Sequence, residues 1–198
     1  MSAVAVGTRE RLLRSAQELV EEGGYGAATV IAIAERAGVA AGTLYRHWPS
    51  KGELFAELFR VVCDREVAAM EAAARSASGT AGRSNVKAVQ AVLTTFARRA
   101  LRNPRLAWAL IAEPVDPLVD AERIAYRREY ARLLGNGLRE AIEAGEIPEQ
   151  NVELTAAALV GGVGEALVGP LSPLAGTAPA AEEIIEALRK FVGRAVGA

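Results

Sequence analysis

Four hydrogen-bonding side chains are crowded into one short stretch of residues 29–51, which read TVIAIAERAGVAAGTLYRHWPSK. Leu44 and Trp48 are four residues apart, so in a helix they share one face and leave the polar residues on the other. A helical turn of this kind suits hydrogen bonding to base edges in the major groove of DNA. The four side chains are Thr43, Tyr45, Arg46 and His47.

The chain contains few side chains that could support catalysis. His47 is the single histidine, Cys63 is the single cysteine, and no acidic pair is clustered. We therefore expect no enzyme activity, no catalytic or metal-binding residue and no cofactor, and we expect His47 to be solvated or to face DNA. One cysteine excludes an intramolecular disulfide, and the N-terminus lacks a signal-peptide pattern, so a cytoplasmic protein is expected.

The helices that would position the four polar side chains can be predicted from residues that cap or end a helix. A first helix over residues 9–22 is expected to begin at a Thr8 cap and to stop at Gly23 and Gly24. Thr29 begins a second helix, which Gly38 ends, and the third helix covers residues 41–48. Ser50 and Glu53 form a capping box that starts a long helix over residues 51–75.

The rest of the chain also reads as helices. Hydrophobic residues make up 51% of the 198 residues, and alternating strand-like runs are absent. We predict an all-α protein with about nine helices, in which residues 1–50 form a three-helix helix-turn-helix DNA-binding domain. Residues 51–198 would form a larger helical ligand-binding and dimerisation domain. Its later helices are expected at residues 86–102, 104–113, 118–144, 151–168 and 180–196.

Two features of these later helices carry further expectations. Gly135 and Gly137 weaken the helix over residues 118–144, where a kink is possible. The most apolar stretch, residues 154–164, is followed by Glu165 and is expected to be too short to span a membrane.

The net charge of the chain does not by itself indicate a protein that binds nucleic acid. The net charge is −1, and residues 1–60 contain seven basic and seven acidic side chains. A DNA-binding surface must therefore come from where the charges lie. This balance leaves open an alternative, an all-helical ligand-binding or scaffolding protein without sequence-specific DNA binding.

The N-terminal segment resembles the TetR family of bacterial transcriptional regulators over about fifty residues. The resemblance rests on Gly24-Tyr25, Thr29-Val30, Ile33-Ala34, Ala37-Gly38-Val39, Gly42-Thr43-Leu44-Tyr45, Trp48 and Ser50-Lys51. The remaining three quarters of the chain matches the family only in layout. The chain departs from the family's usual polar residues at Ile31, Ala32, Ala40 and Ala41, so we expect fewer charge contacts to DNA.

The resemblance implies roles for individual residues. Thr29 would cap the second helix beside a DNA phosphate. Tyr45 and Lys51 would contact the DNA backbone, and Arg46 would contact a guanine base. Ala41 could meet a thymine methyl group, and Trp48 is expected in the core. The DNA-facing set is Thr29, Ala41, Gly42, Thr43, Tyr45, Arg46, His47 and Lys51.

Polar aromatic residues indicate a ligand pocket in the second domain. Tyr126 and Tyr130 share one helical face, and a purely structural core would usually use Leu or Phe there. The alternative is that the hydroxyl tips simply reach solvent. The predicted ligand-binding residues are Phe96, Trp108, Leu110, Glu113, Tyr126 and Tyr130.

Small residues in residues 151–168 suit close approach between subunits, and the resemblance implies a four-helix bundle with a partner subunit. The predicted dimer interface consists of Ala157, Gly161, Gly164, Ile184, Leu188 and Phe191. The sequence thus predicts a homodimeric regulator, a repressor of transcription, that binds double-stranded operator DNA and an unidentified small-molecule effector and has no membrane contact.

Overall fold

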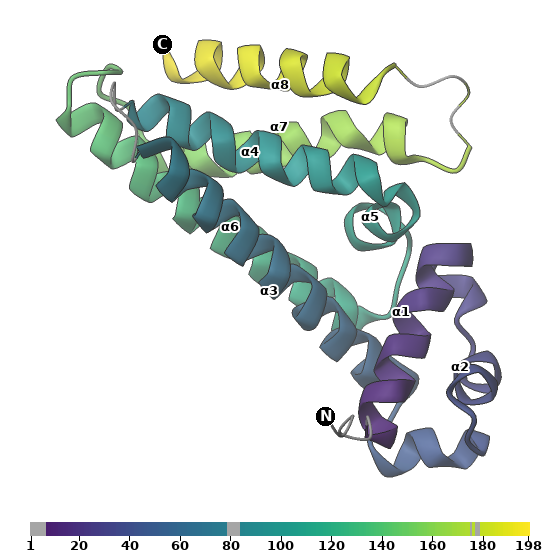
Figure 1. Ribbon diagram of the computed structural model, residues 1–198. Coiled ribbons are helices and arrows are strands. Elements are labelled where there is room, and N and C mark those ends of the chain that lie inside the picture. Colours follow the sequence, from purple (N-terminus) through teal and green to yellow (C-terminus); the bar gives the residue numbers. More distant parts are fainter. Residues whose placement is uncertain (1–6, 79–83, 175, 177–178) are drawn as a thin grey trace, which may run out of the picture. The chain divides into compact units, whose positions relative to one another are not determined.

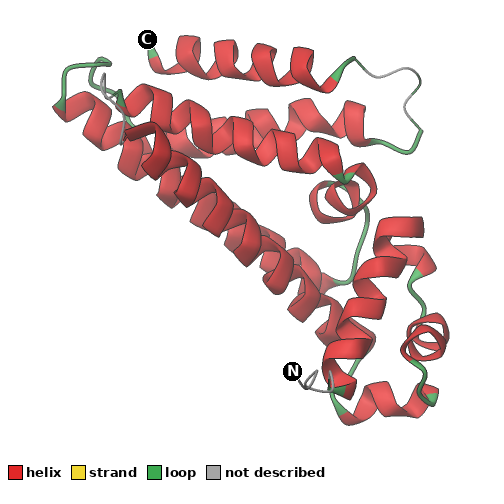
Figure 2. Cartoon of the chain, in the orientation of Figure 1, coloured by secondary structure: helices red, strands yellow, loops and turns green. Residues whose placement is uncertain are grey.

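The computed structural model describes residues 7–78, 84–174, 176 and 179–198. Within those ranges the chain is helical and contains no strand, which confirms the predicted all-α class (Figure 2). The described helices also match the predicted number of about nine. They are α1 (Thr8–Ala27), α2 (Val30–Ala37), the 3₁₀ helix η1 (Ala41–Arg46), α3 (Lys51–Ser78), α4 (Asn85–Arg102), α5 (Pro104–Ile111), α6 (Pro117–Glu143), α7 (Val152–Leu171) and α8 (Ala181–Val196), as labelled in Figure 1 where room allows.

The contacts divide the chain into two compact units. The N-terminal unit contains the chain up to Val62 together with Arg105–Arg123. The C-terminal unit contains Cys63–Pro104 and Ile124–Ala198. Thus α5 from Arg105 onward and the first residues of α6 belong to the same unit as α1, α2 and η1. The domain boundary at residue 50 stays a prediction.

Local caps shape the N-terminal helices. The Thr29 hydroxyl accepts the amide of Ala32 at 3.1 Å, and Gly38 ends α2 in the left-handed conformation with φ 68°. α1 is interrupted at Gly24, where φ is 80° and ψ is −177°, so the predicted stop is found as a break inside the element. The predicted Thr8 cap was wrong: Thr8 is already helical, and Gly7 precedes it in an extended conformation without a side-chain cap.

The C-terminal unit is built on α4, which packs against both α7 and α8 (Figure 1). Asn151 caps α7 as predicted, since its side chain accepts the amide of Leu154 at 2.9 Å. α6 runs without interruption through Gly135 and Gly137, so the possible kink is not found. Gly137 instead allows close packing, because a Cβ atom there would lie 2.9 Å from Cγ2 of Val89 on α4.

α7 is longer than predicted. It passes through Pro170 and reaches Leu171, giving 20 residues. By length and composition it is the one helix in the described part of the chain that could cross a membrane, so the expectation that this stretch is too short was wrong. Only one stripe of α7 is buried in the protomer, which leaves a largely apolar face to be explained. The buried residues are Val152, Ala156, Leu159, Val163, Leu167 and Leu171.

Candidate nucleic-acid interface

The segment that carries the predicted DNA contacts folds as a short 3₁₀ helix. The sequence predicts a helix over residues 41–48, whereas η1 spans Ala41–Arg46. Ala40 precedes it with no side-chain cap, and the amide of Thr43 bonds to the carbonyl of Ala40 at 2.9 Å. The tighter i→i+3 pattern thus satisfies an amide that a Ser or Thr cap would otherwise bind.

The inner side of η1 is fixed to the N-terminal unit. Leu44 is fully buried and Trp48 is 3% exposed, as the spacing predicts. The Trp48 indole Nε1 donates to Oε2 of Glu57 on α3 at 2.7 Å. Arg9 of α1 binds the same oxygen at 2.5 Å and stacks its guanidinium over the Trp48 ring at 5.1 Å. These contacts fix η1 between α1 and α3.

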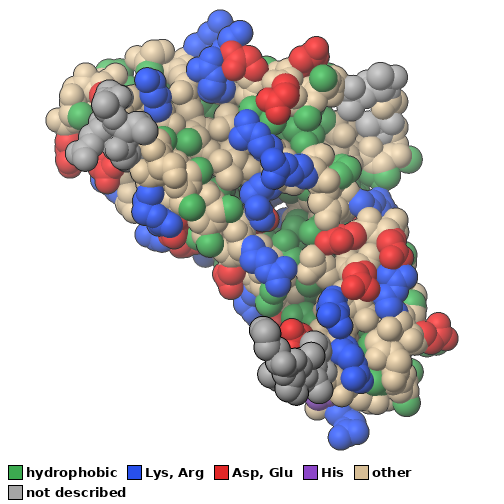
Figure 3. Space-filling view, in the orientation of Figure 1, with side chains coloured by type: hydrophobic (Ala, Val, Ile, Leu, Met, Phe, Trp, Pro, Cys, Tyr) green, Lys and Arg blue, Asp and Glu red, His purple; other side chains and the backbone are tan. Residues whose placement is uncertain are grey.

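The outer side of η1 presents most of the predicted DNA-facing residues together. Tyr45 is 55% exposed and Thr43 is half-buried. Arg46 has no ion pair with any described residue. Figure 3 shows one face of the molecule, where basic and acidic side chains are interspersed over the N-terminal helices without a continuous basic surface. The exposed residues of the set are Ala41, Gly42, Tyr45, Arg46 and His47.

Lys51, which is predicted to contact the DNA backbone, lies against two aromatic rings of the N-terminal unit. Its ammonium lies 4.5 Å from the ring centre of Tyr25 and 5.2 Å from that of Phe55. Burial lowers the pKa of Lys51, while the nearby Asp116 carboxylate opposes that shift. Contact with a DNA phosphate stays a prediction, and this cation already has intramolecular aromatic partners.

Several other cations of the N-terminal unit are paired internally. Arg36 holds both carboxylate oxygens of Glu22, at 2.6 and 2.7 Å, and Arg60 is paired with Glu122. Charge available for phosphate is therefore concentrated on few side chains, of which Arg46 is the one on the exposed side of η1.

A polar joint holds α5 against the break in α1, all within the N-terminal unit. Arg105 Nη2 donates to the carbonyl of Gly23 at 2.6 Å, and the Glu113 carboxylate accepts the amide of Tyr25 at 3.1 Å. A Cβ atom on Gly24 would lie 2.7 Å from Cζ of Arg105 and 2.8 Å from Oε1 of Glu113. We call Gly23, Gly24, Tyr25, Arg105 and Glu113 the α1–α5 joint. Sequence reasoning missed it, because its partners are 82 to 88 residues apart.

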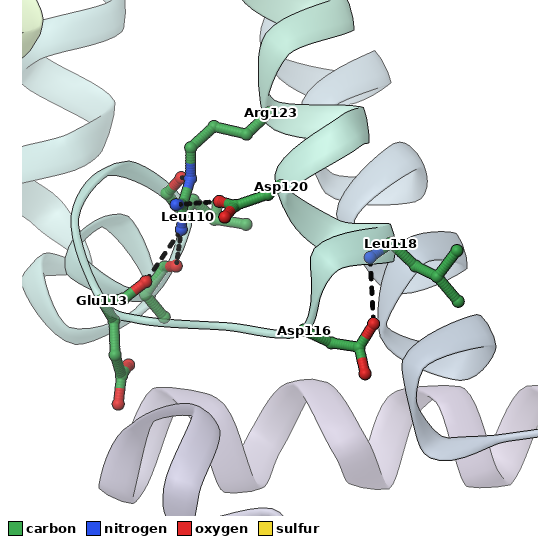
Figure 4. A network of polar contacts seen from close by, with 7 residues as sticks. Leu110, Glu113, Asp116, Leu118, Asp120 and Arg123 are labelled. Carbon is green, nitrogen blue, oxygen red and sulfur yellow. Dashed lines mark hydrogen bonds and ion pairs between the residues drawn. The ribbon is translucent and has the colours of Figure 1, made fainter.

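Arg123 holds the loop that carries Glu113 in place. Its guanidinium donates to the carbonyls of Leu110 and Glu113 at 2.8 and 3.0 Å and pairs with Asp120 at 2.6 Å (Figure 4). A cation at the carboxyl end of α5 satisfies carbonyls that the helix leaves free. The predicted ligand residue Glu113 is thereby directed to the α1 backbone.

The other predicted ligand residues fall into two groups. Phe96, Tyr126 and Tyr130 come together in the C-terminal unit, with ring centres 5.7 Å apart for Phe96–Tyr130 and 6.2 Å for Tyr126–Tyr130. Tyr126 donates to Asp64 at 2.5 Å, and burial, followed by the neighbouring Cys63, raises the pKa of Tyr130. Trp108 and Leu110 are half-buried in the N-terminal unit. Ligand binding by the six residues stays a prediction.

The predicted dimer residues lie partly on an open face. Ala157 and Gly161 are exposed, and no atom lies within 4 Å of a Cβ built on Gly161 or Gly164. Phe191 is 45% exposed, and Ile184 is half-buried. Leu188 differs: it is 5% exposed and packs inside the protomer, so it is not available to that face.

Comparisons with known proteins agree with this geometry. The family model for bacterial regulatory proteins of the tetR family matches residues 12–58, which contain α2 and η1. The chain is 34% identical over 102 residues to the HTH-type transcriptional repressor KstR of Rhodococcus jostii (strain RHA1), covering 52% of this chain and 45% of that protein. It therefore spans less than half the length of this relative.

A second relative is matched over a larger share of its length. The KstR repressor of Mycolicibacterium smegmatis is 30% identical over 146 residues, covering 74% of this chain and 68% of that protein. The crystal structure of the transcriptional regulator FadR from Bacillus subtilis in complex with stearoyl-CoA superposes with a TM-score of 0.72 at 20% identity, covering 94% of this chain and 96% of that one. The buried anchors of η1, its exposed polar side and these similarities lead to one conclusion: the chain belongs to the TetR family of bacterial transcriptional regulators.

Proposed function

We propose that this protein is a transcriptional repressor that binds double-stranded operator DNA as a homodimer. The observation that carries the proposal is the two-sided construction of η1. Leu44 and Trp48 are buried, while Tyr45, Arg46 and His47 are exposed on the opposite side. A recognition element must be anchored on one side and polar on the other to read base edges.

Each DNA-facing residue has a chemical task in this proposal. Arg46 suits a bidentate contact to guanine, and Ala41 suits a thymine methyl group. Tyr45 and the amino end of α2 at Thr29 suit phosphates, which set the register of the protein on the duplex. Thr43 and His47 complete the set of groove-facing donors and acceptors. Lys51 keeps its proposed backbone contact only if it leaves its aromatic partners.

The homodimer is proposed to form through the open face of α7 and the exposed edge of α8. The face is apolar and small at Ala157, Gly161 and Gly164, and Phe191 is exposed beside Gly162. Covering it with a second copy would explain why only six residues of this apolar 20-residue helix are buried within the protomer. Two-fold symmetry would match a palindromic operator with half-sites roughly 34–36 Å apart, or a multiple of that distance.

Control by a small molecule is the remaining part of the proposal, together with a cytoplasmic location. Support comes from the fold, since a FadR of the same fold was solved with stearoyl-CoA bound. An effector releases DNA only through its different affinities for the DNA-bound and free states.

The test is selection from a random DNA pool with the purified full chain, followed by binding measurements. Enrichment of a palindrome is expected. Arg46→Ala should then weaken binding by about 1–3 kcal/mol, roughly 5- to 150-fold, and relax the preference at one base pair. Arg132→Ala is a matched control, because Arg132 is exposed on α6 and paired with Glu129. Failure to enrich any sequence would favour the alternative of a helical ligand-binding or scaffolding protein.

A further inference from the structure

One acidic residue interrupts the open apolar face of α7. Glu165 lies four residues after Gly161, on the side of the helix opposite its buried stripe. Its carboxylate has no ion pair or hydrogen bond with any described residue, whereas Glu153, the other acid of α7, is paired with Arg139 at 2.8 Å. If a partner covers this face, the Glu165 carboxylate needs a cation, because an unpaired buried charge is strongly destabilising. The exposed residues of the face are Leu154, Ala157, Ala158, Gly161 and Glu165.

An available cation lies on the exposed side of α8. Arg194 follows Phe191 by three residues, so the two share one face of the helix, and both are exposed. They also line a surface hollow of about 490 Å³. The other two cations of α8, Arg189 and Lys190, are paired with Glu186 at 2.8 and 3.5 Å. The Arg194 guanidinium has no ion pair with any described residue, so it is the cation of α8 that is available to a partner.

The antiparallel arrangement of α7 and α8 separates these two residues within the protomer. α8 runs back along α7 and contacts it (Figure 1). Gly162 and Phe191 lie at the same level, since a Cβ atom on Gly162 would be 3.3 Å from Cζ of Phe191. Glu165 and Arg194 each lie three residues beyond that level, in opposite directions. At about 1.5 Å per residue, they are roughly 9 Å apart along the helices.

A two-fold axis at the level of Phe191 would bring opposite charges together. Phe191 is the large apolar side chain that α8 exposes, and Gly161 is an open position with no atom within 4 Å of a Cβ atom built there. A protruding side chain and an open position at one level fit each other in a symmetric pair when the axis crosses the helices at that level. Rotation about this axis reverses the direction along the helices. The partner's Arg194 therefore arrives at the level of Glu165.

We propose that Glu165 of each subunit binds the partner's Arg194, and that these two ion pairs set the register of the homodimer and its preference for a second copy of the same chain. The proposal rests on the homodimer of the proposed function and names the residues that select the partner. A polar residue at one position of an apolar seam specifies register, because a shifted arrangement leaves its charge unpaired. A related chain that lacks either charge would leave the other uncompensated, which disfavours mixed dimers.

Charge reversal tests the ion pairs in sedimentation experiments on the purified full chain. Glu165→Arg places two cations at each pair, and Arg194→Glu places two anions there. Each variant alone should dimerise at least about 100-fold more weakly than the wild-type chain, because like charges oppose association. An equimolar mixture of the two variants should form a heterodimer, because opposite charges then meet at both pairs. Arg189→Glu is the matched control, exposed on α8 but away from the Phe191 face, and should remain dimeric.

The outcomes distinguish the ion pairs from the homodimer itself, and none depends on operator binding. A monomeric wild-type chain would overturn both. A wild-type dimer whose two charge-reversal variants also dimerise alone, or stay monomeric when mixed, would overturn the ion pairs and leave the homodimer standing. Arg194 also lies in the last turn of α8, where the helix dipole favours a cation, but that role alone predicts no rescue on mixing.

Thermal unfolding of each variant checks that it is folded, as expected for side chains exposed in the protomer. If a reversal variant does not fold, Glu165→Gln and Arg194→Gln give a double-mutant cycle on the dimer dissociation constant. We expect the second substitution to weaken the dimer less once the first is present. Independent effects of the two substitutions would overturn the pairing.

Discussion

The geometry of the α1–α5 joint predicts that adding one methyl group at Gly24 lowers the free energy of unfolding substantially. Gly24 has φ 80° and ψ −177°, a region that is populated almost only by glycine. Gly24→Ala should therefore cost about 1–3 kcal/mol in the backbone alone. The new Cβ atom would also lie 2.7 Å from Cζ of Arg105 and displace its hydrogen bond to Gly23. Loss of a hydrogen bond to a charged group adds about 1.5–3 kcal/mol.

The expected total is a loss of about 2.5–6 kcal/mol in the free energy of unfolding, measured by denaturant titration. A double-mutant cycle with Arg105→Ala separates the two parts. Without the guanidinium, Gly24→Ala should cost the backbone part and the displacement of Glu113 Oε1, which lies 2.8 Å from the new Cβ atom. The coupling free energy with Arg105 should then be about 1.5–3 kcal/mol. Gly26→Ala is the control, because nothing lies within 4 Å of a Cβ atom there and its φ is not positive. A coupling below about 0.5 kcal/mol would refute the reasoning, since independent sites add within that range.

Three further predictions concern charge and assembly. Because Arg9, Arg36 and Arg60 are paired, we expect a log–log salt slope for operator binding that is shallower than about −9, the slope for about ten phosphate contacts; a slope of about −9 or steeper would contradict this. Burial would raise the pKa of Glu146, but hydrogen bonds from the amides at the start of α4 and from Ser84 lower it. Its stabilising effect is full above the ordinary glutamate pKa and is lost as the pH falls through the lowered value. Glu146→Gln should therefore destabilise the protein by about 1 kcal/mol at pH 7 and much less at pH 3 in thermal unfolding. Gly161→Arg should yield folded monomers in sedimentation experiments, whereas Ala144→Arg should remain dimeric; a dimer in both would place the interface elsewhere.

Caps and breaks could be predicted because they are local. Thr29, Ser50 and Asn151 each bind an amide three residues ahead, and Gly38 ends its helix by its own conformation. The sequence contains both partners within one turn. The difference between the predicted helix over residues 41–48 and the observed η1 also has a local cause. The Ala40 side chain cannot cap a helix, and the backbone forms a 3₁₀ helix there instead.

Partners far apart in sequence could not be predicted. Nothing in the pattern around Glu57 indicates that it binds both Trp48 and Arg9, which lies 48 residues away. Glu113 was expected in a ligand pocket because it is polar near a helix end, yet it receives the amide of Tyr25. A periodic pattern identifies the face of a helix and leaves open which segment that face meets.

The edges of apolar stripes posed a third difficulty. The apolar residues of α8 cover a wide arc, and the sequence assigns Leu188 and Phe191 alike to a subunit interface. The structure buries Leu188 in the protomer and leaves Phe191 at the edge, 45% exposed. The stripe is wider than one packing interface requires, so its two edges have different partners.

The internal pairing of cations bears on how such a repressor would be released. If Arg46 is the main free cation of each η1, phosphate contacts contribute little to operator affinity, and the base contacts of η1 contribute more. Moving η1 by an ångström or two is enough to break base contacts, because hydrogen bonds weaken steeply with distance and angle. An effector then needs only a few kcal/mol of differential affinity to favour the released state, within the usual range of allosteric coupling. A weakly charged reading surface would therefore make control by a small-molecule effector energetically easier. Replacing Glu22 by Gln would free Arg36 from its ion pair and should raise DNA affinity while reducing sensitivity to release.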